Sequence, residues 1–342
     1  NLGENIVVQG GTFYNDAVLR AFEKEIERNV IRPSLAGLMG AFGAALYAKQ
    51  NSEELSSVLN SEELSSFYHS VKSVKCSGCS NACRLTVNTF DKNRKYIGGN
   101  RCDKPVTSVK NDGKLNLYQY IRNTLSSYSD IDKKPLIGLP LALNMYELLP
   151  FWHTFFKEMG FGIKVSPPSN RKLYFLGQNT IPSDTICYPA KLAHGHIEYL
   201  INQKTDAVFY PCMTYNFDEK ISDNHYNCPV VAYYPEVIKA NVPDFSKTRF
   251  IYDYVGLHRP SHFKKSIFKI LKDNFPEENI KFGRVKKAVK KAYLEYFKYM
   301  NSIRNRAKEI IEYSIENKIP VIILAGRPYH VDPEINHGID EL

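Results

Sequence analysis

Seven cysteines are the residues of this 342-residue chain whose type and spacing point most directly to chemistry. Their number is odd, and no secretory signal precedes them, which argues for a reducing, cytoplasmic compartment and against a disulfide framework. Four thiolates suit a closed tetrahedral zinc site or a cubane iron–sulfur cluster, and the spacing leaves the two metals open. Four of the cysteines lie within 27 residues: Cys76, Cys79, Cys83 and Cys102.

The segment around these four cysteines is expected to be a small ribbon over residues 72–110. The runs 84–90 and 95–97 read as two strands of a hairpin, which places Cys102 just after the return strand. A zinc ribbon usually presents two Cys-x-x-Cys pairs, and the second pair is missing here.

The other three cysteines fall in a region of alternating strands and helices, residues 133–255. Strands are predicted at 136–139, 162–165, 207–210 and 230–233, and helices at 144–159, 170–176 and 189–202. This alternation predicts a parallel sheet covered by helices, whose ligands lie beyond the carboxyl ends of the strands. Cys212 follows one strand and Cys187 precedes a helix on that side, whereas Cys228 precedes the expected strand 230–233 and is assigned to the opposite edge.

Polar residues near these cysteines are expected to support the site rather than to react. His194 and His196 are two residues apart on a helix, so they point to different faces and cannot readily chelate one metal. Lys191 is a candidate partner for an anionic group, and Glu147 is expected to orient a helix.

The net charge of +9 arises from an excess of basic residues in one segment of the chain. Residues 281–308 hold ten Lys and Arg residues against the single Glu295, on a predicted helix within a helical region, 256–318. The helix has an apolar face, and its lysines fall on the other faces. A solvated face and a docking surface for an acidic partner both fit, and nucleic acid fits poorly because no recognition motif accompanies the charge.

The first 50 residues predict a strand at 6–9, a tight Gly10-Gly11 turn, a helix over 15–28 and a small-residue helix over 36–48. A Gly-Gly turn beside a helix start exposes N–H groups that suit a phosphate, although a turn that needs positive φ is the commoner cause. A polar linker with a short duplication follows at 51–71, and an apolar strand over 320–326 starts a further α/β unit, 319–342. No apolar run is long enough for a membrane span.

The N-terminal order of motifs resembles the closing segment of the BadF/BadG type of ATPase, which activates 2-hydroxyacyl-CoA dehydratases and benzoyl-CoA reductases. The resemblance covers about residues 4–49 and rests on the run from Gln9 to Asn15 and on 40–45. It implies the C-terminal piece of an actin-like ATPase domain, in which Gly10, Gly11 and Asn15 line an ATP cleft. The phosphate loops of that superfamily are absent here, so the ATP site is incomplete and the chain alone is expected to be inactive.

Later motifs resemble the dehydratase-like module of large fused activase proteins. They include the run 187–196, Tyr210-Pro-Cys212, Asn227-Cys-Pro229 and Gly326-Arg-Pro-Tyr-His330. The resemblance implies a 4Fe–4S cluster held by three cysteines, which map onto Cys187, Cys212 and Cys228.

Together these expectations describe a fragment of a multidomain α/β iron–sulfur protein. Its actin-like piece, Cys-rich ribbon and parallel-sheet module would couple ATP hydrolysis in the complete protein to low-potential electron transfer onto a CoA thioester. An acidic donor such as ferredoxin or flavodoxin, and a dimer, are compatible partners. The alternative is a non-catalytic, zinc-stabilised scaffold that docks partners through its basic helix.

Overall fold

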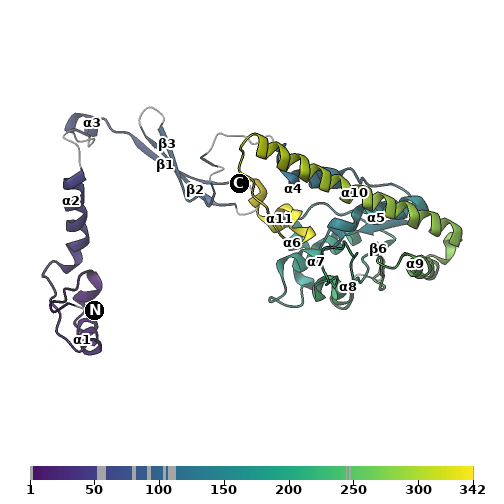
Figure 1. Cartoon of the computed structure of the whole chain (residues 1–342), viewed down its shortest axis with the longest axis horizontal. Coiled ribbons are helices and arrows are strands. Elements are labelled where there is room, and N and C mark those ends of the chain that lie inside the picture. The colour runs from purple at the N-terminus through teal and green to yellow at the C-terminus, as the bar shows by residue number, and fades with distance from the viewer. Residues whose placement is uncertain are drawn as a thin grey trace. The chain divides into compact units, whose positions relative to one another are not determined.

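The computed structural model describes residues 3–51, 59–78, 82–90, 94–102, 105–106, 113–243, 245 and 248–341 (Figure 1). Its contacts divide the chain into two units, Asn1–His69 with Phe90–Arg94, and Ser70–Thr89 with Lys95–Leu342. Cys79, most of the duplicated linker (52–58) and the turn of the predicted hairpin (91–93) lie outside the described residues.

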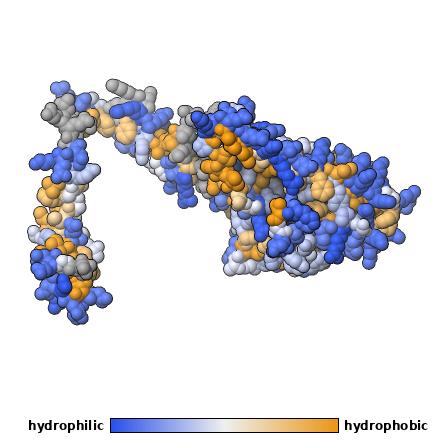
Figure 2. Space-filling model, in the orientation of Figure 1, coloured by the Kyte–Doolittle hydropathy of each residue, from blue (hydrophilic) through white to orange (hydrophobic). Residues whose placement is uncertain are grey.

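The first unit is built from short helices with little core. Its elements are η1 (Gly11–Tyr14), α1 (Asp16–Glu25), η2 (Ala36–Leu38), α2 (Met39–Asn51) and α3 (Ser61–Ser65). The strand expected over 6–9 is reduced to one bridge between Val7 and Ile31. The helix expected over 15–28 ends at Glu25, and Asn15 caps its start by accepting a hydrogen bond from the Ala17 N–H. α2 buries none of its residues, and apolar patches show on this unit in Figure 2.

A three-stranded sheet follows, in the order β1-β2-β3. The two predicted strands are present as β2 (Arg84–Phe90) and β3 (Arg94–Gly98). The first strand, β1 (His69–Lys75), was not among the predicted ones, because its alternating polar sequence is mostly exposed and carries no apolar face.

The main body is a mixed α/β fold around a four-stranded parallel sheet in the order β5-β4-β6-β7. The strands are β4 (Leu136–Leu139), β5 (Gly162–Val165), β6 (Ala207–Phe209) and β7 (Arg249–Ile251). Leu136 lies opposite Gly162, and Ala207 lies between Ile137 and Arg249. The first two strands coincide with the predicted ranges, because short apolar runs bounded by Pro or Gly are typical of buried parallel strands.

Helices cover this sheet and close its core. They are α4 (Leu117–Ser126), α5 (Met145–Met159), α6 (Arg171–Gly177), α7 (Tyr188–Asn202), α8 (Pro229–Asn241), α9 (Pro260–Asn274), α10 (Phe282–Glu316) and α11 (Pro333–Asn336). The long helix α10 packs along α5 (Figure 1). Its predicted apolar face is confirmed, since Val285, Val289, Ala292, Tyr296 and Tyr299 are buried.

The strand predicted over 230–233 is wrong, because these residues lie in helix α8. The run Val-Val-Ala-Tyr favours a strand by composition, but Pro229 occupies the first helical position, where its fixed φ suits a helix start. The buried residues Val231, Tyr234 and Ile238 recur at helical spacing. The fourth strand is instead β7, a three-residue element too short to stand out in the sequence.

The strand predicted over 320–326 is also absent, since these residues form no regular element. Val321, Ile322 and Ile323 are exposed, and within the described part of the chain no strand pairs with them. A strand forms only where a neighbour supplies backbone hydrogen bonds, so strand-forming side chains alone were not sufficient. The short turns η6 (Pro328–Val331), α11 and η7 (Ile339–Glu341) follow. No helix among the described residues is both long and apolar enough to cross a membrane.

Candidate functional site

Three cysteines reach the carboxyl edge of the parallel sheet from three different elements. Cys187 is the N-cap residue of α7, Cys228 is the N-cap residue of α8, and Cys212 lies three residues after the end of β6. α7 leads into β6 and α8 leads into β7, so both helices begin at the edge where the parallel strands end. The fold therefore places all three thiols on the side where parallel sheets bind ligands.

Cys228 is consequently not at the opposite edge, and the sequence-based placement is corrected. The segments that follow Cys212 and precede Cys228 are joined by a bridge between Tyr215 and Tyr226. Asn227 donates its N–H to the Thr214 carbonyl at 3.0 Å and its side-chain amide to the Met213 carbonyl at 2.9 Å. The error followed from reading 230–233 as a strand, which reversed the direction of the chain.

Two tyrosines lie among these cysteines. Burial first, and then the neighbouring Tyr234, Cys212 and Cys187 side chains, raise the pKa of Tyr210. Its side chain is fully buried, and its hydroxyl has no hydrogen-bond partner in the described structure. The pKa of Tyr329 is likewise raised, by burial first and then by Cys187 and Cys228. Cys187 thus lies within electrostatic range of both phenols, Cys212 within range of Tyr210, and Cys228 within range of Tyr329.

The three thiols differ in their surroundings. Cys187 is exposed, Cys228 is half-buried and Cys212 is buried. Burial, aided by Glu236, raises the pKa of Cys212 to about 11, so its free thiol stays protonated at neutral pH. Cys187 and Cys228 are the N-cap residues of α7 and α8, beside the free N–H groups of each helix start. Among the described residues, no three His, Cys, Asp or Glu side chains are arranged so that they could already hold a metal ion.

The two histidines of α7 are structural, as predicted. His194 Nδ1 lies 2.8 Å from Thr180 Oγ1, and its Nε2 lies 3.0 Å from the Tyr234 hydroxyl. His196 Nδ1 and Nε2 lie 2.7 and 2.9 Å from the hydroxyls of Ser166 and Ser169. Burial lowers the pKa of His194 to about 4 and that of His196 to about 3, so both rings are neutral near pH 7.

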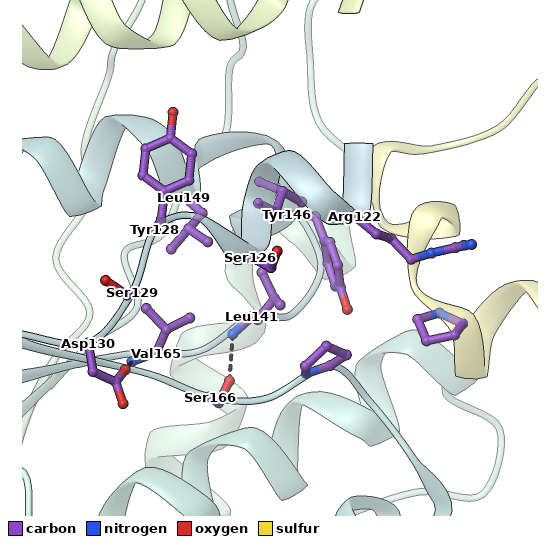
Figure 3. A pocket seen from close by; sticks show the side chains of 13 residues that line it. Arg122, Ser126, Tyr128, Ser129, Asp130, Leu141, Tyr146, Leu149, Val165 and Ser166 are labelled. Carbon is purple, nitrogen blue, oxygen red and sulfur yellow. Dashed lines mark hydrogen bonds between the residues drawn. The ribbon is translucent and has the colours of Figure 1, made fainter. Parts of the chain in front are cut away.

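A pocket of about 290 Å³ opens beside the ends of β4 and β5. Figure 3 shows Leu141, Tyr146, Val165 and Ser166 around it, with the Leu141 N–H donating to the Ser166 hydroxyl at 2.7 Å. Because Ser166 also contacts His196, one wall of the pocket is continuous with the buried polar groups of α7. Its lining combines apolar side chains with five hydroxyl groups and the charged Arg122 and Asp130, an arrangement suited to a small polar organic molecule.

Asp332 ties the C-terminal loop to this edge of the sheet. It is fully buried and accepts hydrogen bonds from the Tyr146 hydroxyl, from the Ser169 N–H at 3.1 Å and from the Glu334 N–H at 2.9 Å. Tyr188, the first residue of α7, donates to Glu334 at 2.9 Å. These contacts hold the loop that carries Tyr329 beside the helix start that carries Cys187.

The remaining candidates near this edge have local roles. The Tyr296 hydroxyl donates to Glu147 at 2.7 Å, which connects α10 to α5 and agrees with the orienting role predicted for Glu147. Lys191 donates to the Asp184 carbonyl at 2.8 Å rather than to an anionic side chain. His330 Nδ1 accepts the Arg327 N–H at 3.1 Å, which folds the Gly326–His330 turn on itself.

The described members of the other cysteine set, Cys76, Cys83 and Cys102, lie on segments at one end of the three-stranded sheet. Cys76 follows β1 and Cys83 precedes β2, and the Cys76 N–H donates to the Cys83 carbonyl at 2.8 Å. Gly99, just after β3, lies so close to Arg84 that a Cβ there would come within 2.5 Å of the Arg84 carbonyl oxygen. Its φ of +80° and this close approach both require glycine, and they bring the segment of Cys102 next to that of Cys83.

The proposed nucleotide residues of the first unit take part in a turn. Gly10 has a φ of +101° before η1, and its N–H donates to the Ala36 carbonyl at 2.8 Å. Asn15 uses its side-chain oxygen to cap α1. Space around Gly10 and Gly11 is open, since a Cβ at either position would meet nothing within 4 Å. The positive φ explains why residue 10 is a glycine, whereas nothing in the turn requires a glycine at residue 11. The open space beside both residues leaves room for a ligand.

Tyr210, Tyr329 and Asp332 were not identified from the sequence as parts of the site. Tyr210 and Tyr329 belong to the motifs Tyr210-Pro-Cys212 and Gly326-Arg-Pro-Tyr-His330, but no role was assigned to either, and their membership in these motifs was the available signal. Asp332-Pro333 resembles a helix start, and this is the role that the structure shows. Nothing in the sequence indicates that the same carboxylate also accepts from Tyr146, which is 186 residues away.

Comparison with known proteins gives two matches. The family model described as the CoA enzyme activase uncharacterised domain (DUF2229) matches residues 136–342, more than half of the chain. The 2-hydroxyisocaproyl-CoA dehydratase activator of Clostridioides difficile is 42% identical over 50 residues. This match covers 15% of the chain and 19% of the relative, so the chain spans about a fifth of the length of that curated protein. No solved structure matches.

Proposed function

Because this chain belongs to the family of the CoA enzyme activase uncharacterised domain, we propose that it is part of an activase system that delivers low-potential electrons to a CoA thioester. The substrate class in this proposal is inferred from the partial relative, an activator of 2-hydroxyisocaproyl-CoA dehydratase. The observation that carries it is the convergence of Cys187, Cys212 and Cys228 on one edge of the parallel sheet.

In this proposal, Cys187, Cys212 and Cys228 hold a 4Fe–4S cluster. The donor set suits such a group, because thiolates are the usual ligands and two of the three lie at helix N-termini. A bound cluster would supply one-electron chemistry at a potential that burial and hydrogen bonds tune. The orphaned Tyr210 hydroxyl is a donor within electrostatic range of Cys187 and Cys212, suited to a hydrogen bond that stabilises negative charge there.

The described loops are not arranged as a finished metal site, so we expect cluster binding and loop ordering to occur together. The residues that anchor these loops are already paired. Asn227 fixes the start of α8 to the Cys212 loop, and Tyr188 fixes the start of α7 to Glu334. The chain thereby limits how far each thiol must move.

The N-terminal unit and the three-stranded sheet have distinct parts in the same proposal. Residues 1–50 form the closing part of an ATP-binding domain with Gly10, Gly11 and Asn15 facing the nucleotide, and ATP hydrolysis in the complete protein drives the electron transfer. Residues 51–71 are a linker, and 72–110 hold a separate zinc or iron–sulfur site at Cys76, Cys79, Cys83 and Cys102. Residues 133–255 with 256–318 form the cluster-binding body, and the segment 319–342 is attached to it through Asp332 and Glu334. An acidic ferredoxin or flavodoxin is the expected donor.

The test is metal analysis of the anaerobically purified chain and of two matched double variants. Iron, sulfide and zinc are measured with the visible absorption spectrum. The Cys187→Ser/Cys212→Ser variant should lose iron and sulfide, because serine hydroxyls do not replace cysteine thiolates as ligands of a cluster. Cys76→Ser/Cys83→Ser is the matched control and should leave that iron in place, while it removes the metal of the three-stranded sheet.

The cluster assignment would be contradicted if the wild-type chain contained no iron. It would also be contradicted if the Cys187→Ser/Cys212→Ser variant kept the iron content of the wild type. Zinc alone, held by the first cysteine set, would instead support a non-catalytic scaffold. Both double variants must retain the far-ultraviolet circular dichroism of the wild type for the comparison to count.

A further inference from the structure

A groove on the basic helix joins two features that the proposed function does not use, an aromatic floor and unpaired lysines. It lies between the middle of α10, the start of α9 and the loop that contains Phe217, and its volume is about 420 Å³. None of the described cysteines lines it. The volume is within the range of pockets that bind small organic ligands.

The floor of the groove is a set of aromatic rings, some of them exposed. The rings of Tyr293 and Phe297 are nearly parallel, with centroids 6.4 Å apart and an interplanar angle of 23°. Phe217 adds a third ring, whose centroid is 5.9 Å from that of Phe297. Phe297 contacts the ring of the buried Tyr296 and is still 48% exposed, so part of its ring is open to a ligand. An exposed aromatic face binds a planar heteroaromatic ring by stacking.

Three lysines surround this floor: Lys264 from α9, and Lys286 and Lys290 from α10. In the described part of the chain, no carboxylate forms an ion pair with any of the three. The adjacent Lys291 is different, because its ammonium group lies 2.7 Å from Glu158. One side of α10 therefore neutralises its charge within the protein, whereas the side that faces the groove concentrates unbalanced positive charge.

Two further groups favour an anion at the same place. The N-terminus of α9, a helix of 15 residues, begins at Pro260 in the wall of the groove, and its N-cap residue Arg259 forms no side-chain cap. His258 also lines the groove, and its Nδ1 is buried without a hydrogen-bond partner in the described structure. His258 therefore adds a polar ring to this wall of the groove.

We propose that this groove binds a phosphorylated nucleotide, with its base on Tyr293 and Phe297 and its phosphates among Lys264, Lys286 and Lys290. The aromatic rings and the lysines together favour a nucleotide over simpler ligands. A purely apolar ligand would not pair with the lysines, and inorganic phosphate would not contact the aromatic rings. A nucleoside diphosphate and the nucleotide half of coenzyme A share this chemistry, and binding measurements separate them. The site is independent of the cysteines and of the glycine turn in the first unit.

Isothermal titration calorimetry of the whole chain tests the site with four probes: ADP, coenzyme A, adenosine and pyrophosphate. ADP or coenzyme A should bind more tightly than adenosine, which lacks charge, and than pyrophosphate, which lacks a ring. Whichever nucleotide binds more tightly identifies the source of the ligand. Equal affinity for ADP and pyrophosphate, or no binding of any nucleotide, overturns the proposal.

Matched lysine variants locate the binding. Lys286→Ala/Lys290→Ala should weaken nucleotide binding by about 100-fold, since each lysine contributes on the order of tenfold when it contacts a phosphate. Lys287→Ala is the control, because Lys287 is exposed on the same helix and does not line the groove. An equal loss in both variants indicates unspecific charge attraction, and no loss in the double variant places the nucleotide elsewhere. Either result overturns the proposal.

A Phe297→Leu variant tests the ring separately. It should reduce nucleotide affinity toward that of pyrophosphate and leave pyrophosphate binding unchanged, because it removes stacking but no charge. Unchanged nucleotide affinity in this variant overturns the assignment of the base to the aromatic floor.

Discussion

Helices α5 and α2 are similar in length and both rich in apolar residues, yet their environments are opposite. α5 has 15 residues and buries Met145, Phe151, Trp152, Phe155 and Phe156 among others, while α2 has 13 residues and buries none. α5 lies between the sheet and α10, whereas Phe42, Leu46 and Tyr47 of α2 are all exposed. An apolar helix is stabilised mainly by the residues that pack against it. The body therefore has a hydrophobic core that stabilises α5, whereas the first unit offers α2 almost no such core.

The largest effect should come from truncation of the aromatic cluster in α5. Trp152 is fully buried and its ring lies 4.5 Å from that of Phe209 on β6. Trp152→Ala should lower the free energy of unfolding of the body by about 3–5 kcal/mol through lost burial and a cavity. Urea unfolding followed by circular dichroism measures it. The matched change Phe42→Ala in α2 should stay within about 0.5 kcal/mol, and a comparable loss there would break the contrast between the helices.

Removal of the Asp332 carboxylate should have the next largest effect. Asp332→Ala leaves the Tyr146 hydroxyl and the N–H groups of Ser169 and Glu334 without their acceptor, at a cost of about 2–4 kcal/mol. The chain has a single tryptophan, Trp152, so its fluorescence during urea unfolding reports on the body. Asp332→Asn keeps one acceptor oxygen and should lose less. Equal losses in both variants would show that the charge, not the acceptor, is what matters.

Acid should destabilise the body through His196. Its pKa is lowered by burial to about 3, whereas the unfolded chain takes up the proton near the ordinary value of about 6.5. The stability that the neutral ring contributes is complete above about pH 6.5 and is lost as the pH falls below it, by about 2 kcal/mol at pH 5. Unfolding free energies of the wild type and His196→Gln between pH 8 and pH 5 measure this difference. The variant should have the flatter profile, and parallel profiles would refute the assignment.

The smallest effect should come from the capping box of α3 in the first unit. Asn60 accepts the Glu63 N–H at 2.9 Å, and Glu63 accepts the Asn60 N–H at 2.9 Å. Asn60→Ala should destabilise this five-residue helix by about 1 kcal/mol. Amide hydrogen exchange at 61–66 should increase, whereas the tryptophan transition of the body should not move. A shift of that transition would show that the two units are coupled energetically.

The cysteine residues illustrate how far the sequence can be read. The spacing of the cysteines predicted two separate sets, and the strand-helix alternation placed Cys187 and Cys212 at the correct edge. Cys228 was misplaced because Val230–Tyr233 has a strand composition, and only the packing of Val231 and Tyr234 against the body decides for a helix. The metal of the first set is a prediction because Cys79 lies outside the described residues, and that of the second is a prediction because the described Cys187, Cys212 and Cys228 are not arranged to hold a metal.

By itself, the sequence determined the elements that depend on local pattern. These include β4 and β5, which are short apolar runs with clear boundaries, and the apolar face of α10. Only the tertiary structure decided whether β-favouring runs become strands, as at 320–326, and which distant groups meet, as at Tyr146 and Asp332. The physical reason is that capping and periodicity act within one or two turns of chain. Strand pairing and buried hydrogen bonds instead depend on partners that the fold brings from far along the sequence.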